Sequence, residues 1–132
     1  MQTFLPYPSF EQSARVLDKR RLGKQRVEAY QILRTLTGIS SGWRNHPAVR
    51  MWASYESALC HYLRTTIQEW MRRGCCNNMT IPDCPDTYQL PPWFGNEEFH
   101  AAHRSNLLRK DPVWYSQFGW SENSDLPYIW PV

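Results

Sequence analysis

Apolar residues recur at helical spacing in three stretches of the chain. In the first stretch, Phe10, Ala14 and Leu17 stand at positions i, i+4 and i+7, which lie on one face of an α-helix. Gly23 is expected to weaken or kink this helix, because glycine costs about 1 kcal/mol relative to alanine in a helix interior. The pattern then resumes with Val27, Tyr30, Leu33 and Leu36. Gly38 suits the position just after a helix end, so we expect helical structure from Phe10 up to Gly38.

The longest apolar stripe begins at Pro47, a residue type that favours the first turn of a helix. Asn45 or His46 is expected to cap this helix. The stripe continues at 3.6-residue spacing to Gly74 through Val49, Trp52, Tyr55, Leu59, Ile67 and Trp70. About 27 residues with a rise of 1.5 Å each give a length of about 40 Å, which spans a small domain. We therefore predict a long central helix in the core.

The third stretch begins at Asn96, which is expected to cap a helix that ends near Pro112. Glu97 and Glu98 stand near its start and Lys110 near its end, as the helix dipole favours.

Two further segments carry no helical pattern. Residues 74–95 contain four prolines and are expected to form an irregular loop that is either functional or packed over the core. The start of the chain is expected to be extended, because Pro6 and Pro8 disfavour helix in the residues before them. No segment shows the alternation of a strand. The sequence therefore predicts an all-α fold, with three main helices around a long central helix, an extended N-terminus, a Pro-rich loop and an aromatic C-terminal tail at 113–132.

The composition is that of one folded domain. The chain has 132 residues, which predicts a single domain over 1–132, and its 42% hydrophobic and 20% charged residues argue against disorder. No apolar run approaches the ~20 residues of a membrane span, and the first residues lack the pattern of a signal peptide. We expect a monomeric intracellular protein without membrane association, cytoplasmic or, in a eukaryote, nuclear. Its cysteines are accordingly expected as reduced thiols: Cys60, Cys75, Cys76 and Cys84.

The net charge is only +3, but basic residues gather in residues 11–34, which contain seven basic and three acidic residues. Such a segment is typical of a phosphate-binding surface, and the alternative is a solvated helix face with its own ion pairs. In the first interpretation the phosphates are contacted by Arg20, Arg21, Lys24 and Arg26. Gln25 would then hydrogen-bond a base edge or a phosphate. In the second, Asp18 and Glu28 pair with Arg21 or Arg15.

Two other groups of polar residues are candidates for a binding site. One group precedes the predicted central helix and consists of Trp43, Arg44, Asn45 and His46. The free N–H groups of a helix start favour an anion, so this group could hold a phosphate or a flipped nucleotide, and a plain capping role for Asn45 is the competing interpretation.

The other group lies on the third predicted helix, where His100 and His103 share a face beside Arg104, and all three are expected to line a polar cleft and contact the DNA. Their spacing, and that of the adjacent Cys75 and Cys76, does not match a zinc site, so we expect no metal and no cofactor.

Aromatic residues reach 14% of the chain. Trp52, Tyr55 and Trp70 stand at helical spacing and are expected to pack in the core. A further five lie in predicted loops: Trp43, Trp93, Trp114, Tyr115 and Trp120. A nucleic-acid base stacked on such a side chain contributes ~1–3 kcal/mol, and we expect one or two of the five to contact a ligand.

Four motifs spread over nearly the whole chain carry a resemblance to a known family. They are Leu17-Asp18-x-x-Arg21-Leu22-x-Lys24-Gln25-x-x-Glu28-Ala29, Asn45-His46-Pro47, His103-Arg104-Ser105-Asn106-Leu107-Leu108-Arg109-Lys110-Asp111-Pro112 and Leu126-Pro127-Tyr128-x-Trp130-Pro131. Together they resemble a branch of small proteins grouped with the pyrimidine-dimer DNA glycosylase/AP lyases of the phage endonuclease V type.

The resemblance implies a mechanism in which the N-terminal α-amine attacks C1′ of the damaged nucleotide and displaces the base. The resulting imine permits β-elimination, which cuts the strand. A glutamate on the first helix moves protons at the sugar, arginines on that helix grip a kinked duplex, and a nucleotide is flipped out.

This sequence departs from the pattern at two places. Gln2 follows Met1, and a side chain of that size generally prevents removal of the initiator methionine, so the nucleophile would be the amine of Met1. The position that matches the catalytic glutamate is Gln25, which cannot serve as acid or base. Glu28 lies three residues on, on roughly the same helix face, and is the substitute candidate.

Three hypotheses follow. The first is a glycosylase for damaged or modified double-stranded DNA, with or without AP lyase activity, that uses Met1 with Glu28 or Gln25. The second is a non-catalytic nucleic-acid-binding module, which the departures at Gln2 and Gln25 favour. The third is an enzyme for a small, nucleotide-like anion in a cleft formed by His46, His100, His103 and Arg104.

Overall fold

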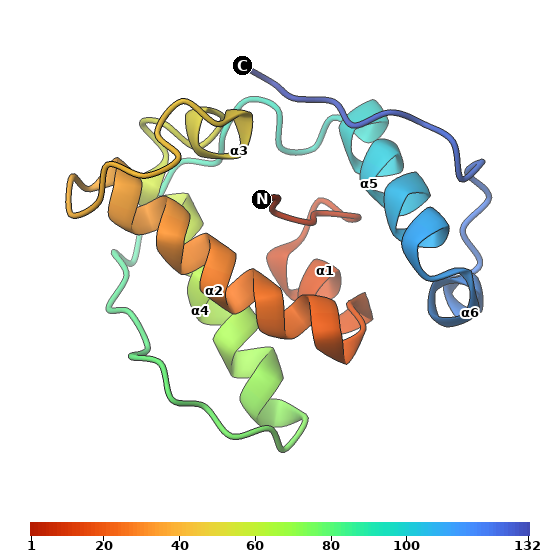
Figure 1. The fold of residues 1–132 in the computed structure, drawn as a ribbon, viewed down its shortest axis with the longest axis horizontal. Coiled ribbons are helices and arrows are strands. Elements are labelled where there is room, and N and C mark those ends of the chain that lie inside the picture. Colours follow the sequence, from red (N-terminus) through yellow and green to blue (C-terminus); the bar gives the residue numbers. More distant parts are fainter.

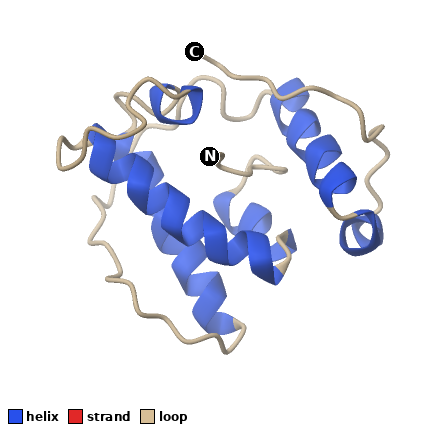
Figure 2. Cartoon of the chain, viewed as in Figure 1, coloured by secondary structure: helices blue, strands red, loops and turns tan.

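The computed structural model describes all 132 residues and contains helices but no strand, as predicted (Figure 2). In chain order the elements are α1 (Phe10–Val16), α2 (Lys19–Leu36), α3 (Pro47–Arg50), α4 (Glu56–Arg72), α5 (Glu97–Lys110), α6 (Pro112–Tyr115) and the 3₁₀ helix η1 (Ser116–Phe118). Residues 74–95 form the expected irregular loop, and Asn96 caps α5 by accepting a hydrogen bond from Phe99 N–H. None of the helices combines the length and the hydropathy that a bilayer span requires.

The break in the first helical stretch lies at Leu17 and Asp18 and not at Gly23. Leu17 is extended, and Asp18 caps α2 by accepting a hydrogen bond from the Arg21 N–H at 3.4 Å. The prediction for Gly23 was wrong because α2 and α4 cross closely at this point. A Cβ at Gly23 would lie 3.1 Å from the indole of Trp70, so glycine permits the approach of the two helices.

The predicted central helix is two helices, α3 and α4, with a bend between them. Ser54 has a φ of 72°, a left-handed conformation that no α-helix contains. Neither glycine nor proline marks this bend. Met51 and Trp52 remain buried across it, which is why their spacing looks helical. The cap of α3 is His46, whose Nδ1 accepts a hydrogen bond from Ala48 N–H at 3.0 Å.

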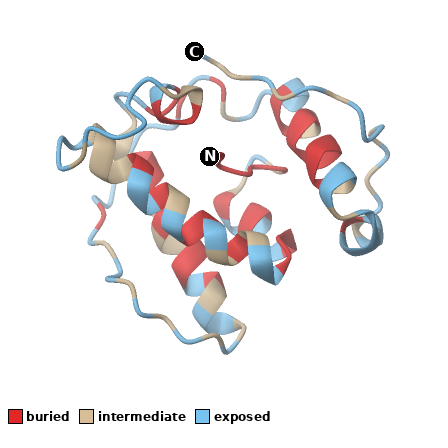
Figure 3. Ribbon diagram, viewed as in Figure 1, coloured by how far each residue is buried: buried red, intermediate tan, exposed pale blue.

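The core surrounds the start of the chain. Helices α2 and α4 cross and bury the largest apolar cluster, which includes Ile32, Leu59 and Tyr62 (Figure 1). A smaller cluster joins Phe4 and Leu17 to residues of α5 and α6. The N-terminal segment, residues 2–5, is buried between these layers, in the middle of the molecule and across from α5 (Figure 3).

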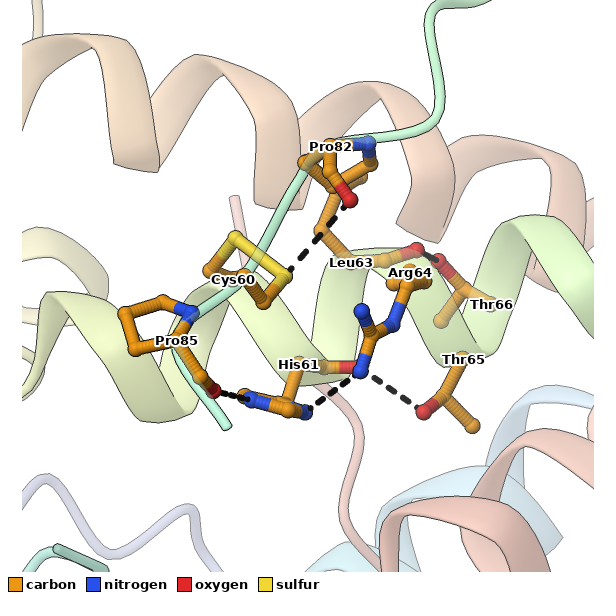
Figure 4. The surroundings of a disulfide bond; sticks show 9 residues. Cys60, His61, Leu63, Arg64, Thr65, Thr66, Pro82 and Pro85 are labelled. Atoms are coloured by element: carbon orange, nitrogen blue, oxygen red, sulfur yellow. Dashed lines mark hydrogen bonds between the residues drawn. A yellow bond between two sulfur atoms is a disulfide. The ribbon is translucent and has the colours of Figure 1, made fainter. Parts of the chain in front are cut away.

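A disulfide fastens the irregular loop to α4. Cys60 of α4 is bonded to Cys84, with their Cα atoms 5.8 Å apart, a normal separation for a disulfide. The imidazole of His61 contacts the Pro85 carbonyl beside it (Figure 4). The prediction of four thiols was therefore wrong for this pair, because the loop returns to α4 and brings two distant cysteines together. Cys75 and Cys76 are thiols, as expected.

Candidate nucleic-acid site at the N-terminus

The N-terminal segment is held on one side by Gln25 of α2. The Gln25 side chain is 1% exposed, and its Oε1 accepts the Phe4 N–H at 2.8 Å while its Nε2 donates to the Gln2 carbonyl at 2.7 Å. The hydroxyl of Tyr62 also reaches the Gln25 oxygen and the Phe4 carbonyl. Burial raises the pKa of Tyr62 well above its usual range, so this hydroxyl keeps its proton and acts as a donor. Gln25 thus pairs with the segment as a neighbouring strand would.

Two histidines of α5 hold the same segment from the other side. His103 Nδ1 accepts the Leu5 N–H at 2.9 Å. His100 Nε2 accepts the Gly95 N–H at 2.9 Å, so its Nδ1 carries the proton and donates to the Leu5 carbonyl at 2.7 Å. Burial, with a smaller contribution from His100, lowers the pKa of His103 to about 3, and burial also lowers the pKa of His100. Both imidazoles are therefore neutral clamps on the backbone.

Arg104 completes this support one residue further along. Its Nη1 donates to the Pro6 carbonyl at 2.8 Å, and it forms ion pairs with Glu97 and Glu122. Arg104, His100 and His103 are all more than 90% buried. All three side chains lie inside the protein and hold the backbone of the N-terminal segment. Their predicted contact with DNA stays a prediction.

The start of the chain borders a cavity of about 360 Å³, which we call the N-terminal cavity. It is lined by Met1, Gln2, Phe4, Arg20, Arg21, Lys24, Gln25, Glu28, Lys110, Tyr128 and Trp130. Four of these side chains are cationic and one is a carboxylate, and Arg21 is partly neutralised by Asp18, 3.2 Å from its Nη1. The cavity therefore favours an anion such as a phosphate. Met1, Gln25 and Glu28, the candidate reactive residues of the sequence, all line this cavity.

Glu28 is the only carboxylate of the cavity. Its Oε2 accepts the Gln2 N–H at 3.2 Å and a Gln25 Nε2–H at 3.4 Å, which leaves Oε1 without a protein partner. The charge of Glu28 affects the pKa of the nearby His46 imidazole. Burial lowers the pKa of His46, the N-terminal ammonium lowers it further, and Glu28 opposes both. His46 does not itself line the cavity, but its ring lies 5.8 Å from the ring of Trp130, which does.

Four lining residues were not among the predicted site residues, and the first of them is Phe4 of the N-terminal segment. Lys110 ends α5, and Tyr128 and Trp130 come from the C-terminal tail. Their rings lie 5.7 Å apart, and burial raises the pKa of Tyr128 to about 12. The sequence did carry a signal for Lys110, Tyr128 and Trp130, because these three residues belong to the motifs of the resemblance.

The remaining predicted residues lie elsewhere. Arg26 is on the far face of α2, with its guanidinium 4.2 Å above the Trp70 ring and its Nη1 donating to Asn77 at 3.3 Å. Burial lowers the pKa of Arg26. Arg44 and Asn45 are exposed on the loop before α3 and do not line the cavity.

The predicted aromatic positions divide between core and surface. Trp52 is fully buried, as predicted, and two of the five loop aromatics, Trp93 and Tyr115, are also buried in the core. Trp43 is the most exposed of the five, at 62%.

Comparison with known proteins identifies the first part of the chain. The model of a family described as pyrimidine dimer DNA glycosylase matches residues 1–83, more than half of the chain. This match covers α1 to α4 and every α2 residue of the cavity. No curated protein and no solved structure matches the chain significantly.

Proposed function

The chain belongs to the pyrimidine dimer DNA glycosylase family, and we propose that it releases a damaged base from duplex DNA with the α-amine of Met1 as the nucleophile. The observation that carries this proposal is the N-terminal cavity, in which Met1, Glu28 and four cationic side chains face one space. The Gln2 N–H to Glu28 hydrogen bond supports it, because it holds the carboxylate one residue from the α-amine.

In the proposed reaction, the unprotonated α-amine attacks C1′ of the damaged nucleotide. The C1′–N bond to the base breaks, and the base leaves with the bonding electrons and takes up a proton. The sugar ring then opens, because the C1′–O4′ bond breaks, O4′ takes up the remaining amine proton and C1′ becomes the carbon of an imine. Glu28, through its unpartnered Oε1, is the group that moves these protons. Removal of a C2′ proton from the imine then breaks the C3′–O bond, which is the proposed AP lyase step.

Gln25 is a positioning residue in this scheme. Its amide is occupied by the backbone of Gln2 and Phe4, so it fixes where the first residue lies and takes no proton. His100, His103 and Arg104 position the same segment from α5.

The cationic residues of the cavity would bind the DNA backbone. Arg20 and Lys24 are exposed at the rim, Lys110 stands across from them at the end of α5, and Arg21 is half-buried. Tyr128 and Trp130 offer rings on which an extruded base could stack. We further propose that one chain suffices for activity, since a single copy supplies every lining residue. Activity on DNA also fits the expected intracellular location.

The test is base release from ultraviolet-irradiated duplex DNA by the wild-type protein and by Glu28→Gln. Glu28→Gln is expected to lower kcat by about 10²- to 10⁴-fold, the usual contribution of a general acid or base, while DNA binding persists. Glu98→Gln is the matched control, because Glu98 is exposed on α5 and lies outside the cavity.

Equal rates for the wild-type protein and Glu28→Gln would contradict the proposed role of the carboxylate. Salt-dependent duplex binding without any base release would indicate the non-catalytic binding module instead. Saturable binding of a free nucleotide without affinity for duplex would indicate the small-anion enzyme.

A further inference from the structure

A second hollow lies along α2, beyond the N-terminal cavity. It has a volume of about 410 Å³ and is formed by one face of α2 and the loop that follows the helix. Its lining residues are Val27, Tyr30, Gln31, Arg34, Thr35, Ser40, Gly42 and Trp43, with no carboxylate among them. We call it the Trp43 hollow. Neither the core nor the proposed reaction uses it.

Trp43 is held in an exposed and unfavourable conformation. Its φ is 67°, in the left-handed region that a bulky residue rarely adopts, and its side chain is 62% exposed. The loop is fixed to α2, because Thr35 Oγ1 donates to the Gly42 carbonyl at 2.8 Å. Backbone strain of this kind concentrates at functional sites. The fold thus presents an exposed indole ring on a loop that is held against α2.

Arg34 gives the hollow a cationic side. Its guanidinium lies 5.5 Å from the centre of the Tyr30 ring, and its Nη1 donates to the Tyr30 hydroxyl at 3.3 Å. No carboxylate pairs with Arg34, so its charge is available to a ligand. An aromatic ring beside an unpaired guanidinium is the combination that proteins use to bind single-stranded nucleic acid.

The Trp43 hollow and the N-terminal cavity are separate, and two rows of side chains link them. Lys24, Glu28 and Gln31 follow one face of α2 from the cavity into the hollow. In the other row, the rings of Trp43 and His46 lie 5.9 Å apart and those of His46 and Trp130 lie 5.8 Å apart. Trp130 lines the cavity. A strand bound in the cavity therefore has a polar face of α2 and a row of aromatic rings leading to Trp43.

We propose that the Trp43 hollow binds an unstacked nucleobase of the DNA strand that occupies the N-terminal cavity, with Arg34 at a phosphate next to it. Ten residues of α-helix separate Lys24 from Arg34 and span about 15 Å. Phosphates of one strand of B-DNA are about 3.4 Å apart along the axis, so the bound base lies about four nucleotides from the lesion. This proposal deepens the proposed function and rests on the DNA substrate that it names.

The first test measures binding of a duplex with one abasic site. Trp43→Ala is expected to weaken binding by about 5- to 150-fold, the range for one base stacked on an aromatic side chain, while Trp43→Phe retains most of the affinity. Ile39→Ala is the matched control, because Ile39 lies on the same loop, is 68% exposed and does not line the hollow. Equal affinity of Trp43→Ala and the wild-type protein would overturn the proposal, and so would equal weakening by Ile39→Ala.

The second test uses the wild-type protein and needs no variant to fold. 5-Bromouracil is placed at single positions one to six nucleotides from the abasic site, and the complex is irradiated and digested with trypsin. Cleavage after Arg34 and Arg44 yields peptide 35–44, in which Trp43 is the only aromatic residue. We expect cross-linking of this peptide, strongest about four nucleotides from the lesion on one side. Cross-links confined to other peptides would overturn the proposal.

Both tests separate this proposal from the proposed function. They report DNA contact at Trp43 whether or not the protein releases a base. If the protein releases a base and Trp43→Ala binds DNA as tightly as the wild-type protein, the proposed function stands and the proposal that the Trp43 hollow binds a nucleobase is wrong.

Discussion

Gln25 shows how one side chain can fix the start of a chain. Only an amide offers a donor and an acceptor in the positions that the Gln2 carbonyl and the Phe4 N–H require. A carboxylate at position 25 would place an acceptor against the Gln2 carbonyl. The glutamine found where the resemblance matches a catalytic glutamate therefore has a structural reason, and Glu28 is left as the acidic group of the cavity.

Replacement of Gln25 tests this explanation through stability. Gln25→Ala is expected to lower the free energy of unfolding by at least about 2 kcal/mol, because two buried backbone groups each lose a partner at about 1–3 kcal/mol. Urea denaturation measures the change. The control is Gln31→Ala on the exposed face of the same helix, for which a change within about 0.5 kcal/mol is expected. A loss no larger than that of the control would show that the amide does not clamp the segment.

His103 makes the same clamp sensitive to pH. An unfolded histidine binds a proton below about pH 6.5, whereas the folded His103 stays neutral down to about pH 3. The unfolded state therefore binds more protons in this window. The free energy of unfolding should fall as the pH drops from about 6.5 towards 3, by up to about 1.4 kcal/mol per pH unit from this residue.

Urea denaturation between about pH 7 and pH 4 measures that slope, and His103→Asn is expected to reduce it by about 1 kcal/mol per pH unit. His100, whose pKa is also lowered, supplies a residual slope of the same sign. An unchanged slope in His103→Asn would mean that His103 is protonated in the folded protein.

Part of the site could be predicted from the sequence, and the residues that only tertiary packing brings to the cavity could not. Glu28 and Gln25 lie one turn apart on one helix, so their proximity follows from local spacing. Lys110 and Trp130 are more than 80 residues further along the chain, and only the docking of α5 and the tail brings them to the cavity. The burial of His100 depends on the same docking, which no local pattern reports.

The helices divide in the same way. Helix α5 was predictable because its cap, Asn96, and its charged ends are local signals. The bend between α3 and α4 was not, because Ser54 adopts a left-handed conformation where neither glycine nor proline marks it, and Met51 and Trp52 stay buried at helical spacing across it. The kink expected at Gly23 is absent for a related reason, since glycine at this position makes room for Trp70 of another helix.

The loop at 74–95 is joined to α4 by one disulfide. The Cys60–Cys84 bond closes a loop with a sequence separation of 24, which by loop entropy stabilises the folded state by about 3 kcal/mol. The double variant Cys60→Ser/Cys84→Ser should lose about this much in urea denaturation. Cys75→Ser/Cys76→Ser is the matched control, because these thiols are not bonded. Equal stability of the two double variants would show that the loop is held by other contacts.

The whole molecule presents its positive charge where the chain begins. Four cationic side chains surround the N-terminal cavity, and salt dependence of DNA binding counts how many meet phosphates. The slope of log K against log salt concentration is expected to be about −4 in the wild-type protein. Arg20→Gln and Lys24→Gln should each reduce its magnitude by about 1.

Arg15→Gln is the control for this measurement, because Arg15 belongs to the basic segment but lines a separate hollow with Glu11 and Glu69. A slope that falls as much in Arg15→Gln as in Lys24→Gln would indicate diffuse attraction without a defined binding surface.

The central claim is that the amine of Met1 reacts with the sugar. Borohydride reduces an imine between protein and an abasic site to a stable bond, and peptide mapping then locates the attached nucleotide. We expect a covalent adduct on the first residue, with Met1 present by intact mass, and no adduct once the α-amine is acetylated. An adduct on Lys24, the nearest competing amine of the cavity on α2, or no adduct at all, would contradict the claim.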